Sequence, residues 1–412
     1  MLTEIGKRVK NASVELAVAS TEEKNRILKA IADSLRENCD KILKANAIDL
    51  QNGRDNGMSE ALLDRLMLNA DRIEGMAQGV EGVISLPDPV GKILWETKRP
   101  NGLKIQRVSS PLGVIGIIYE ARPNVTSDAA ALAIKSGNTA ILRGGKEAFN
   151  SNSAIMDIMR EAVAKEGFNP DIIELVRDTS RESSTALMRM NKYVDVLIPR
   201  GSAKLINAVV ENSTVPVIET GAGNCHIYVD EYADIDMAAE IVYNAKTQRI
   251  SVCNTAESLL IHKNIAEFAL IAIKARLDEK NVILYGDEFA REICPDIEEA
   301  SEEDWATEYL DYKMSVKIVS SVEEAAEHIR KYSTGHSESI ITENIENAEK
   351  FMNMVDSSAV YHNASTRFTD GGEFGFGAEI GISTQKLHAR GPLGLEQLNS
   401  FKYKIYGDGQ VR

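Results

Sequence analysis

The chain has few of the residues that build metal centres and disulfide frameworks. Its 412 residues include four cysteines and six histidines, with no Cys-x-x-Cys pair and no histidine cluster at zinc-ligand spacing. Structural zinc sites and disulfide-stapled folds depend on such spacings. We therefore expect no metal site and no disulfides, and a reducing, cytoplasmic compartment.

Long apolar runs and an excess of positive charge are also absent. No segment approaches the length of a membrane span, and the first residues continue into polar helical sequence without a signal-peptide pattern. The 47 basic and 62 acidic residues give a net charge of −15, which argues against a nucleic-acid partner. We expect a soluble globular protein of two or three domains that binds neither membrane nor nucleic acid. An anionic substrate would need a local group of arginines and lysines.

Helix and strand patterns predict an α/β fold. Apolar residues recur at helical spacing through roughly the first 90 residues. From residue 113 onward, strands are predicted at 114–119, 140–142, 172–176, 194–198 and 215–218, with helices at 127–136 and 153–165 among the segments between them. A second series places strands at 258–261, 315–319 and 339–341. Alternating strands and helices are typical of mostly parallel sheets.

A β-hairpin is predicted at 93–108, where Asn101-Gly102 separates two β-prone runs. A hairpin with little core of its own favours pairing with a further strand. The tail at 401–406 alternates like an edge strand, and we expect it to extend this hairpin.

Cys253 is the candidate nucleophile. It lies on a polar turn, Gln248-Arg-Ile-Ser-Val-Cys-Asn-Thr255, between two apolar stretches. A thiol near a basic residue such as Arg249 ionises more readily than a core cysteine. An inert, buried cysteine is the alternative. The sequences around Cys39, Cys225 and Cys294 are of ordinary helix, strand and surface type.

Two loops that follow strands carry residues suited to a nucleotide. No Gly-x-Gly-x-x-Gly follows a strand, so the usual dinucleotide fingerprint is missing. Arg143-Gly144-Gly-Lys146 nevertheless follows the strand at 140–142, at the end where open α/β sheets bind ligands, and its glycines and cations could hold a ribose phosphate. Arg200-Gly201-Ser202 has the same character and could receive a pyrophosphate. A solvated loop with chance charges is the alternative for the first segment.

Asn124 closes the segment Tyr119-Glu-Ala-Arg-Pro-Asn124 after the most apolar predicted strand. Because the preceding proline stiffens the turn, the Asn124 amide is a candidate oxyanion donor. Helix capping is the alternative. His336 lies in another polar loop, where a histidine is more often structural than functional.

Taken together, these segments resemble the aldehyde dehydrogenase superfamily, and within it the family of γ-glutamyl phosphate reductases (glutamate-5-semialdehyde dehydrogenases). The motifs cover nearly the whole chain: 83–91, 98–103, 111–126, 252–257, 335–338, 363–368 and 371–375. The resemblance implies an aldehyde dehydrogenase-like α/β fold with two α/β domains, mostly parallel sheets and a small β oligomerisation arm. It places an NADPH-binding domain at 1–92 with 110–233 and 363–384, a catalytic domain at 234–362, and the arm at 93–109 with 385–412.

Carried over residue by residue, the resemblance implies that Cys253 is the nucleophile and that Asn124 and the Cys253 backbone amide stabilise the oxyanion. Glu219 resembles the hydrolytic base of ordinary aldehyde dehydrogenases, with a lesser role here. The residues implied in NADPH/NADP binding are Arg143, Gly144, Lys146, Gly201, Ser202 and Glu308, the last at the nicotinamide ribose. The cation at 146 favours NADPH, whose 2′-phosphate needs a positive partner. The candidates for substrate contacts are Arg122, Arg249 and Arg367, with His336 and Ser337; a surface or interface role for each stays open.

The implied reaction is NADPH-dependent reduction of L-glutamyl 5-phosphate to L-glutamate 5-semialdehyde and phosphate through a cysteine thioester, the second step of proline biosynthesis. One alternative is an ordinary NAD(P)-dependent aldehyde dehydrogenase with hydrolytic deacylation. Another is a catalytically silent protein that keeps the fold. The resemblance also implies a homo-oligomer, dimer or tetramer, and leaves open a transient contact with glutamate 5-kinase.

Overall fold

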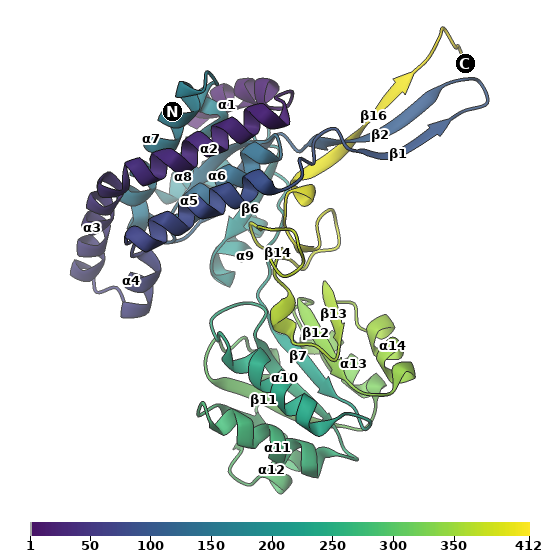
Figure 1. Ribbon diagram of the computed structural model, residues 1–412. Coiled ribbons are helices and arrows are strands. Elements are labelled where there is room, and N and C mark those ends of the chain that lie inside the picture. Colours follow the sequence, from purple (N-terminus) through teal and green to yellow (C-terminus); the bar gives the residue numbers. More distant parts are fainter. Residues whose placement is uncertain (1) are drawn as a thin grey trace. The chain divides into compact units, whose positions relative to one another are not determined.

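The computed structural model describes residues 2–412, apart from the side chain of Ala61. It divides into two compact units (Figure 1). The first comprises Met1–Thr220, Gly375–Gly381 and Leu393–Arg412, and the second Gly221–Phe374 and Ile382–Pro392. Within residues 2–412, every helix is too short or too polar to span a bilayer.

The first unit contains a parallel sheet of four strands, in the order β5 (Ile173–Leu175), β4 (Thr139–Arg143), β3 (Val114–Tyr119) and β6 (Val196–Arg200). Every residue of β3 is buried, which explains its uninterrupted apolar sequence. The predicted strand at 215–218 is wrong, because only an isolated bridge joins Val217 to Leu197. Pro216 lacks the N–H that a strand would donate there.

Helices surround this sheet, and the predicted N-terminal helical layer is confirmed. They are α1 (Leu2–Leu16), α2 (Thr21–Glu37), α3 (Cys39–Asp55), α4 (Glu60–Leu66), α5 (Ala70–Ser85), α6 (Asn124–Lys135), α7 (Phe149–Lys165), α8 (Arg181–Met188) and α9 (Ala203–Asn212). A capping box between Ser20 and Glu23 fixes the start of α2, and its apolar face buries Leu28, Ile31 and Leu35.

An antiparallel sheet of three strands completes the first unit. β1 (Ile93–Lys98) pairs with β2 (Lys104–Pro111), which also pairs with β16 (Asn399–Tyr406). The predicted hairpin and its extension by the C-terminal tail are therefore confirmed. Gly102 adopts a φ of 91° in the connecting loop, a conformation that suits glycine. Large apolar side chains such as Trp95 and Phe401 are exposed on this sheet.

The second unit is built on seven parallel strands. Their order is β10 (Glu298–Glu299), β9 (Ile283–Gly286), β11 (Lys313–Val319), β8 (Ala256–His262), β7 (Cys225–Val229), β12 (Ser337–Ile341) and β13 (Ala359–His362). The helices of this unit are α10 (Ile235–Thr247), α11 (Ala266–Asp278), α12 (Glu288–Ile293), α13 (Val322–Tyr332) and α14 (Ile345–Met354). Two short strands, β14 (Ile382–Ser383) and β15 (Gly391–Pro392), form a separate antiparallel sheet.

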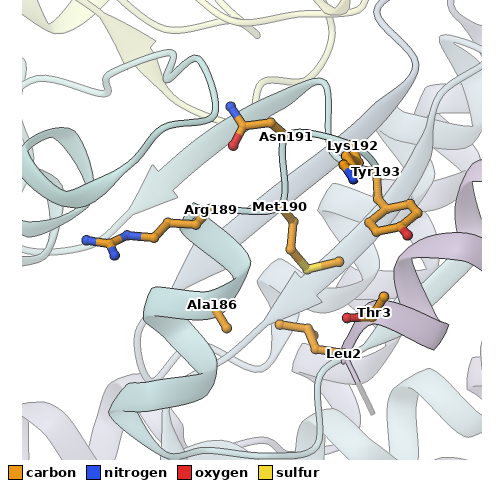
Figure 2. Close-up of a pocket in the computed structure, with 8 residues that line it drawn as sticks. All are labelled: Leu2, Thr3, Ala186, Arg189, Met190, Asn191, Lys192 and Tyr193. Carbon is orange, nitrogen blue, oxygen red and sulfur yellow. The ribbon is translucent and has the colours of Figure 1, made fainter.

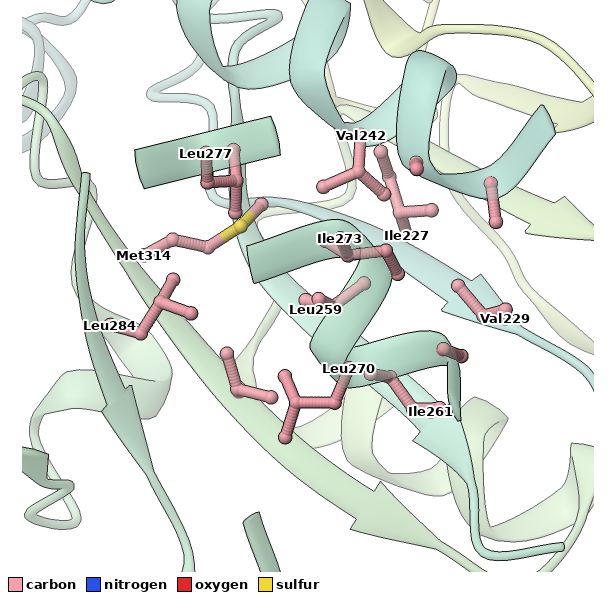
Figure 3. Close-up of a cluster of buried hydrophobic side chains, with 14 of the residues drawn as sticks. Ile227, Val229, Val242, Leu259, Ile261, Leu270, Ile273, Leu277, Leu284 and Met314 are labelled. Carbon is pink, nitrogen blue, oxygen red and sulfur yellow. The ribbon is translucent and has the colours of Figure 1, made fainter. Parts of the chain in front are cut away.

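The core of the second unit lies between β8 and the helices α10 and α11. Figure 3 shows Leu259 and Ile261 of β8 packed with Leu270 and Ile273 of α11 and with Val242 of α10. All five side chains are fully buried. Burial of each such side chain contributes about 1.5–3 kcal/mol, so this core holds β8 firmly beside the Cys253 loop that precedes it.

The boundaries between the units differ from the predicted domain boundaries. The first division falls between Thr220 and Gly221 rather than after residue 233, because β7 pairs with β8 and β12 of the second unit. Residues 363–374 and 382–392 also belong to the second unit. Of the predicted arm, residues 93–109 and 393–412 belong to the first unit and residues 385–392 to the second, so the arm is not a third body.

Candidate active site

Cys253 lies in the loop between α10 and β8, within the second unit, and its side chain is half-buried. The buried cysteine of this region is Cys225, which is fully enclosed at the start of β7. Burial raises the pKa of the Cys225 thiol well above its usual value and keeps it neutral. The two cysteines therefore occupy different environments, and only Cys253 combines partial exposure with a basic neighbour in the loop.

Hydrogen bonds hold the main chain around Cys253. The Thr255 hydroxyl donates to the Arg249 carbonyl at 2.7 Å and so closes the loop. The Asn254 amide nitrogen donates to the carbonyls of Arg367 and Thr369 at 3.2 and 3.0 Å. Because these bonds involve the residues on the C-terminal side of Cys253, they fix the position from which its thiol emerges.

Gly223 packs against the nucleophile loop and has no space for a side chain. Its N–H donates to Glu308 Oε1 at 2.7 Å, and the Cys225 thiol donates to the Cys253 carbonyl at 3.2 Å. Burial raises the pKa of Glu308, and the bond from Gly223 partly offsets this. Glu308 thus holds the main chain at Gly223, next to the Cys253 loop. Its contact with the nicotinamide ribose stays a prediction.

His336 and Ser337 belong to a buried polar network below the loop. Both side chains are fully buried. His336 Nδ1 lies 2.8 Å from Ser337 Oγ and 3.8 Å from Cys225 Sγ, and Ser337 Oγ lies 2.6 Å from Thr369 Oγ1. Burial lowers the pKa of His336 to about 4, so the ring is neutral at pH 7. The side chains of His336 and Ser337 therefore bond to other protein groups and support the structure around the loop. Their direct contact with the substrate stays a prediction.

The charges of Arg249 and Cys253 both act on Arg367, so these three residues lie near one another, while their contact with an anionic substrate stays a prediction. Arg367 Nε donates to Gln248 Oε1 at 3.0 Å. The pKa of Arg367 is lowered first by burial and then by the charge of Arg249, against the opposing influence of Asp370 and Cys253. Arg122, the third predicted arginine, lies on an exposed loop of the first unit.

A buried ion pair at the two ends of the loop was missed from the sequence. Lys246 at the end of α10 bonds Glu257 at the start of β8, and both side chains are fully buried. Burial raises the pKa of Glu257 to about 7 and lowers that of Lys246, while each charge favours the ionised form of the other. The only signal in the sequence was opposite charge on either side of Cys253, which alone says nothing about burial.

The predicted cofactor loops lie at one end of the first unit's sheet. β4 and β6 flank β3, and all three run parallel, so the loops after β4 and β6 share the carboxyl edge. Lys146 is exposed directly after β4. Arg143 instead donates to the carbonyls of Thr179 and Ser180 at 2.8 and 3.1 Å, and burial lowers its pKa. A Cβ on Gly144 would lie 2.2 Å from the Asn152 amide nitrogen, so glycine is required there.

Ser202 caps α9, and its donors hold a carboxylate in this structure. The Ser202 N–H and hydroxyl donate to Glu120 at 3.0 and 2.6 Å. A Cβ on Gly201 would meet the Glu120 side chain at 2.6 Å, so the glycine permits this approach. The N-terminus of α9 thus holds an internal carboxylate that the sequence did not reveal, and pyrophosphate binding there stays a prediction.

Asn124 opens α6 without capping it. The N-cap position is Pro123 and no side chain caps the helix, so the capping alternative is wrong. The Asn124 amide nitrogen donates to Asp128 Oδ2 at 3.0 Å, one helical turn away. Burial raises the pKa of Asp128 to about 6.

The predicted base Glu219 is half-buried, one residue before the end of the Met1–Thr220 segment of the first unit.

A cavity of about 420 Å³ in the first unit contains none of the predicted site residues (Figure 2). It is lined by Leu2, Thr3, Ala186, Arg189, Met190, Asn191, Lys192 and Tyr193. Within the described part of the chain, no three His, Cys, Asp or Glu side chains form a group that could hold a metal ion.

Comparisons with known proteins agree with the family resemblance and with the fold. Residues 3–309 match the model of the aldehyde dehydrogenase family. The chain is 57% identical over 411 residues to a protein of Lachnospira eligens named gamma-glutamyl phosphate reductase, covering 100% of this chain and 99% of that protein. A protein of the same name from Clostridium perfringens is 58% identical over 408 residues, with 99% and 98% covered.

Solved structures show the same relationship. The crystal structure of gamma-glutamyl phosphate reductase from Thermotoga maritima has a TM-score of 0.99 and 51% identity, and the match covers 100% of this chain and 99% of that one. An acetylating aldehyde dehydrogenase from Geobacillus thermoglucosidasius has a TM-score of 0.70 at 17% identity, with 100% and 97% covered. The second likeness shows the fold alone.

Proposed function

Because this chain belongs to the aldehyde dehydrogenase family, with gamma-glutamyl phosphate reductases as full-length relatives, we propose that it reduces L-glutamyl 5-phosphate to L-glutamate 5-semialdehyde and phosphate. NADPH is the proposed reductant, and the reaction would form the second step of proline biosynthesis. The observation that carries the proposal is the half-buried Cys253 on a braced loop, with Arg249 and Arg367 beside it.

The residues of the first unit fit a nucleotide cofactor. Ser202 at the N-terminus of α9 already holds a carboxylate, so its donors suit a pyrophosphate oxygen. Lys146 is an exposed cation at the same sheet edge and would hold the 2′-phosphate. Gly144 and Gly201 keep side chains out of these loops, and Arg143 supports the loop after β4. When bound, NADPH supplies the hydride that reduces the thioester.

In the first half of the proposed reaction, the Cys253 thiolate attacks the C5 carbonyl of the acyl phosphate. The Cys253 N–H stabilises the negative charge that develops on the carbonyl oxygen, and the family resemblance proposes the Asn124 amide as a second donor. Asp128, an acceptor in its ionised form, fixes which end of the Asn124 amide carries the donors. Phosphate then leaves, and a thioester on Cys253 remains.

In the second half, reduction of the thioester gives a thiohemiacetal on Cys253. This collapses to the aldehyde and restores the thiolate, so no water attacks the thioester in the forward direction. Glu219 consequently has a minor role in this direction. The neutral His336 and the neutral Cys225 support the loop without adding charge near the reacting sulfur.

The phosphate requirement of the reverse reaction tests the proposal. The purified protein should oxidise glutamate 5-semialdehyde with NADP only when phosphate or arsenate is present, and Cys253→Ala should abolish this activity. Cys39→Ala, a substitution of a half-buried helical cysteine, is the matched control and should leave it intact. Oxidation without phosphate would instead support the alternative, an ordinary NAD(P)-dependent aldehyde dehydrogenase that hydrolyses its thioester.

The proposal includes a homo-oligomer in the cytoplasm. Its support is the apolar surface of β1 and β16, where Trp95, Phe401 and Tyr403 are exposed in the three-stranded sheet. Exposed apolar groups of this kind favour association with another surface. Sedimentation of the purified protein should show a species larger than the 45.2 kDa chain, and Phe401→Glu should shift it toward that mass. A transient contact with glutamate 5-kinase would deliver the unstable acyl phosphate.

A further inference from the structure

We propose that Arg249 and Arg367 bind the phosphate group of the substrate, on the leaving-group side of Cys253, rather than the substrate's α-carboxylate. This inference rests on the proposed function and names the part of the substrate that this pair receives. The observations that carry it are main-chain bonds, side-chain placement and local charge within the second unit.

The main chains of both arginines are bonded to the residues that follow the nucleophile. Thr255 donates to the Arg249 carbonyl, and Asn254 donates to the Arg367 carbonyl. The Thr366 hydroxyl returns a bond of 2.8 Å to the Asn254 carbonyl. Asn254 and Thr255 are themselves almost fully buried. The two arginines are therefore fixed in position relative to Cys253 by short, buried links.

The Arg367 side chain is held near Arg249, close enough for the Arg249 charge to lower the pKa of Arg367. Arg367 uses Nε to bond Gln248, the residue before Arg249, which directs its guanidinium toward the start of the loop. The terminal nitrogens are the donors that a guanidinium offers in bidentate phosphate contacts. Arg249 is exposed and Arg367 half-buried, so the pair presents one solvated and one partly desolvated cation.

The charge of this pair is only partly offset by the surrounding protein, through the charges of Asp370 and Cys253 near Arg367. Within residues 2–412, no carboxylate lies within ion-pair distance of either guanidinium. Asp370, whose charge opposes that of Arg367, also uses Oδ1 to accept the Gly372 N–H at 2.8 Å. Lys246 and Glu257 neutralise one another. The guanidinium groups of Arg249 and Arg367 repel each other, and binding of an anion relieves this repulsion. A phosphate dianion does so more fully than a carboxylate, which carries a single charge.

The connectivity of the substrate decides which anion this is. The phosphate is bonded through one oxygen to the carbon that Cys253 attacks, whereas two carbons separate that carbon from the one bearing the α-carboxylate. As the S–C bond forms, the C–O bond to phosphate breaks and its electron pair stays on the departing oxygen. Cations next to the sulfur therefore meet the group whose negative charge increases, and they stabilise its departure. No proton, oxidant or reductant is needed in this step.

The reverse reaction separates the two anions, because phosphate and the semialdehyde are independent substrates. For Arg249→Lys and Arg367→Lys, we expect the KM for phosphate and for arsenate to rise about tenfold, since bidentate contacts are lost. The KM for the semialdehyde should stay within about twofold of the wild-type value. Arg330→Lys, at an exposed arginine paired with Glu327 in the same unit, is the control and should change neither constant.

The outcomes are distinguishable from failure of the proposed function. A wild-type protein with no phosphate-dependent oxidation would reject the function itself. With that activity present, a rise in the KM for the semialdehyde alone would assign the pair to the α-carboxylate and overturn the inference. Unchanged KM values for both substrates would also overturn it. Because Arg249 is exposed, Arg249→Lys keeps the test valid even if substitution of the half-buried Arg367 lowers stability.

Discussion

A Cβ atom on Gly223 would lie 1.4 Å from the carbonyl oxygen of Cys253. Contacts under 3.0 Å of this kind are not tolerated by real Cβ atoms, and the obstacle is backbone rather than a flexible side chain. The absence of a side chain at Gly223 is therefore a condition for the position of the nucleophile.

Gly223→Ala should reduce kcat by at least a hundredfold, because the Cys253 carbonyl must move and the thiol moves with it. The measurements are steady-state kinetics and the rate at which iodoacetamide alkylates Cys253. Gly75→Ala is the matched control, since Gly75 lies inside α5 with nothing near its missing Cβ. It should stabilise the protein by about 0.5–1 kcal/mol and leave activity unchanged. Wild-type kinetics in Gly223→Ala would show that the loop position is not critical.

Glu120→Gln should tighten NADPH binding about tenfold, or about 1.4 kcal/mol. The Glu120 carboxylate accepts from the Ser202 N–H and hydroxyl, the donors proposed for the pyrophosphate, and its charge repels that group. Titration calorimetry of the cofactor-free protein measures the Kd. Glu211→Gln, on the exposed C-terminal part of α9, should leave it unchanged. Weaker binding in Glu120→Gln would mean that this carboxylate supports the site.

Lys146→Glu should shift the preference from NADPH toward NADH. The substitution replaces attraction to the 2′-phosphate with repulsion, and the ratio of kcat/KM values for the two cofactors should fall on the order of a hundredfold. Lys165→Glu, at the exposed end of α7, provides the same charge change away from the loop. An equal shift in both variants would assign the effect to overall charge.

Acid should destabilise the fold partly through His336. Burial lowers its pKa from 6.5 to about 4, so the unfolded chain takes up a proton before the folded one does. The stability that the neutral His336 contributes to the folded state is complete above pH 6.5 and is lost as the pH falls toward 4. The full pKa shift of His336 corresponds to about 3 kcal/mol of unfolding free energy. Denaturant unfolding at several pH values should give a flatter dependence for His336→Gln than for the wild type. The control His388→Asn, at an exposed residue with a φ of 66° that asparagine tolerates, should retain the wild-type slope.

The fold was predictable where one physical signal dominated. β3 was predicted to the residue, because six consecutive buried side chains leave an unbroken apolar run. The start of α6 was predicted three residues late, at 127, because Pro123 begins the turn rather than ending the preceding segment. The strand expected at 215–218 failed because a proline removes a ladder donor from an otherwise β-prone run.

The site was predictable only where its residues are neighbours in sequence. Cys253 and Arg249 share one loop, so their association could be predicted. The contact of Arg367 with that loop depends on Asn254, whose partner lies over a hundred residues away. The ion pair of Lys246 with Glu257 and the bond from Ser202 to Glu120 depend on burial and tertiary position. No period or composition signal encodes such pairings.

The pairing of β16 with β2 has a consequence for synthesis on the ribosome. Tyr406 lies opposite Lys104, so the middle strand of this sheet is made long before its second partner exists. The first unit also needs Leu393–Arg412, which are translated after almost all of the second unit. A nascent chain thus carries an open sheet edge until residues 399–406 have left the exit tunnel, and truncation before residue 399 would expose that edge permanently.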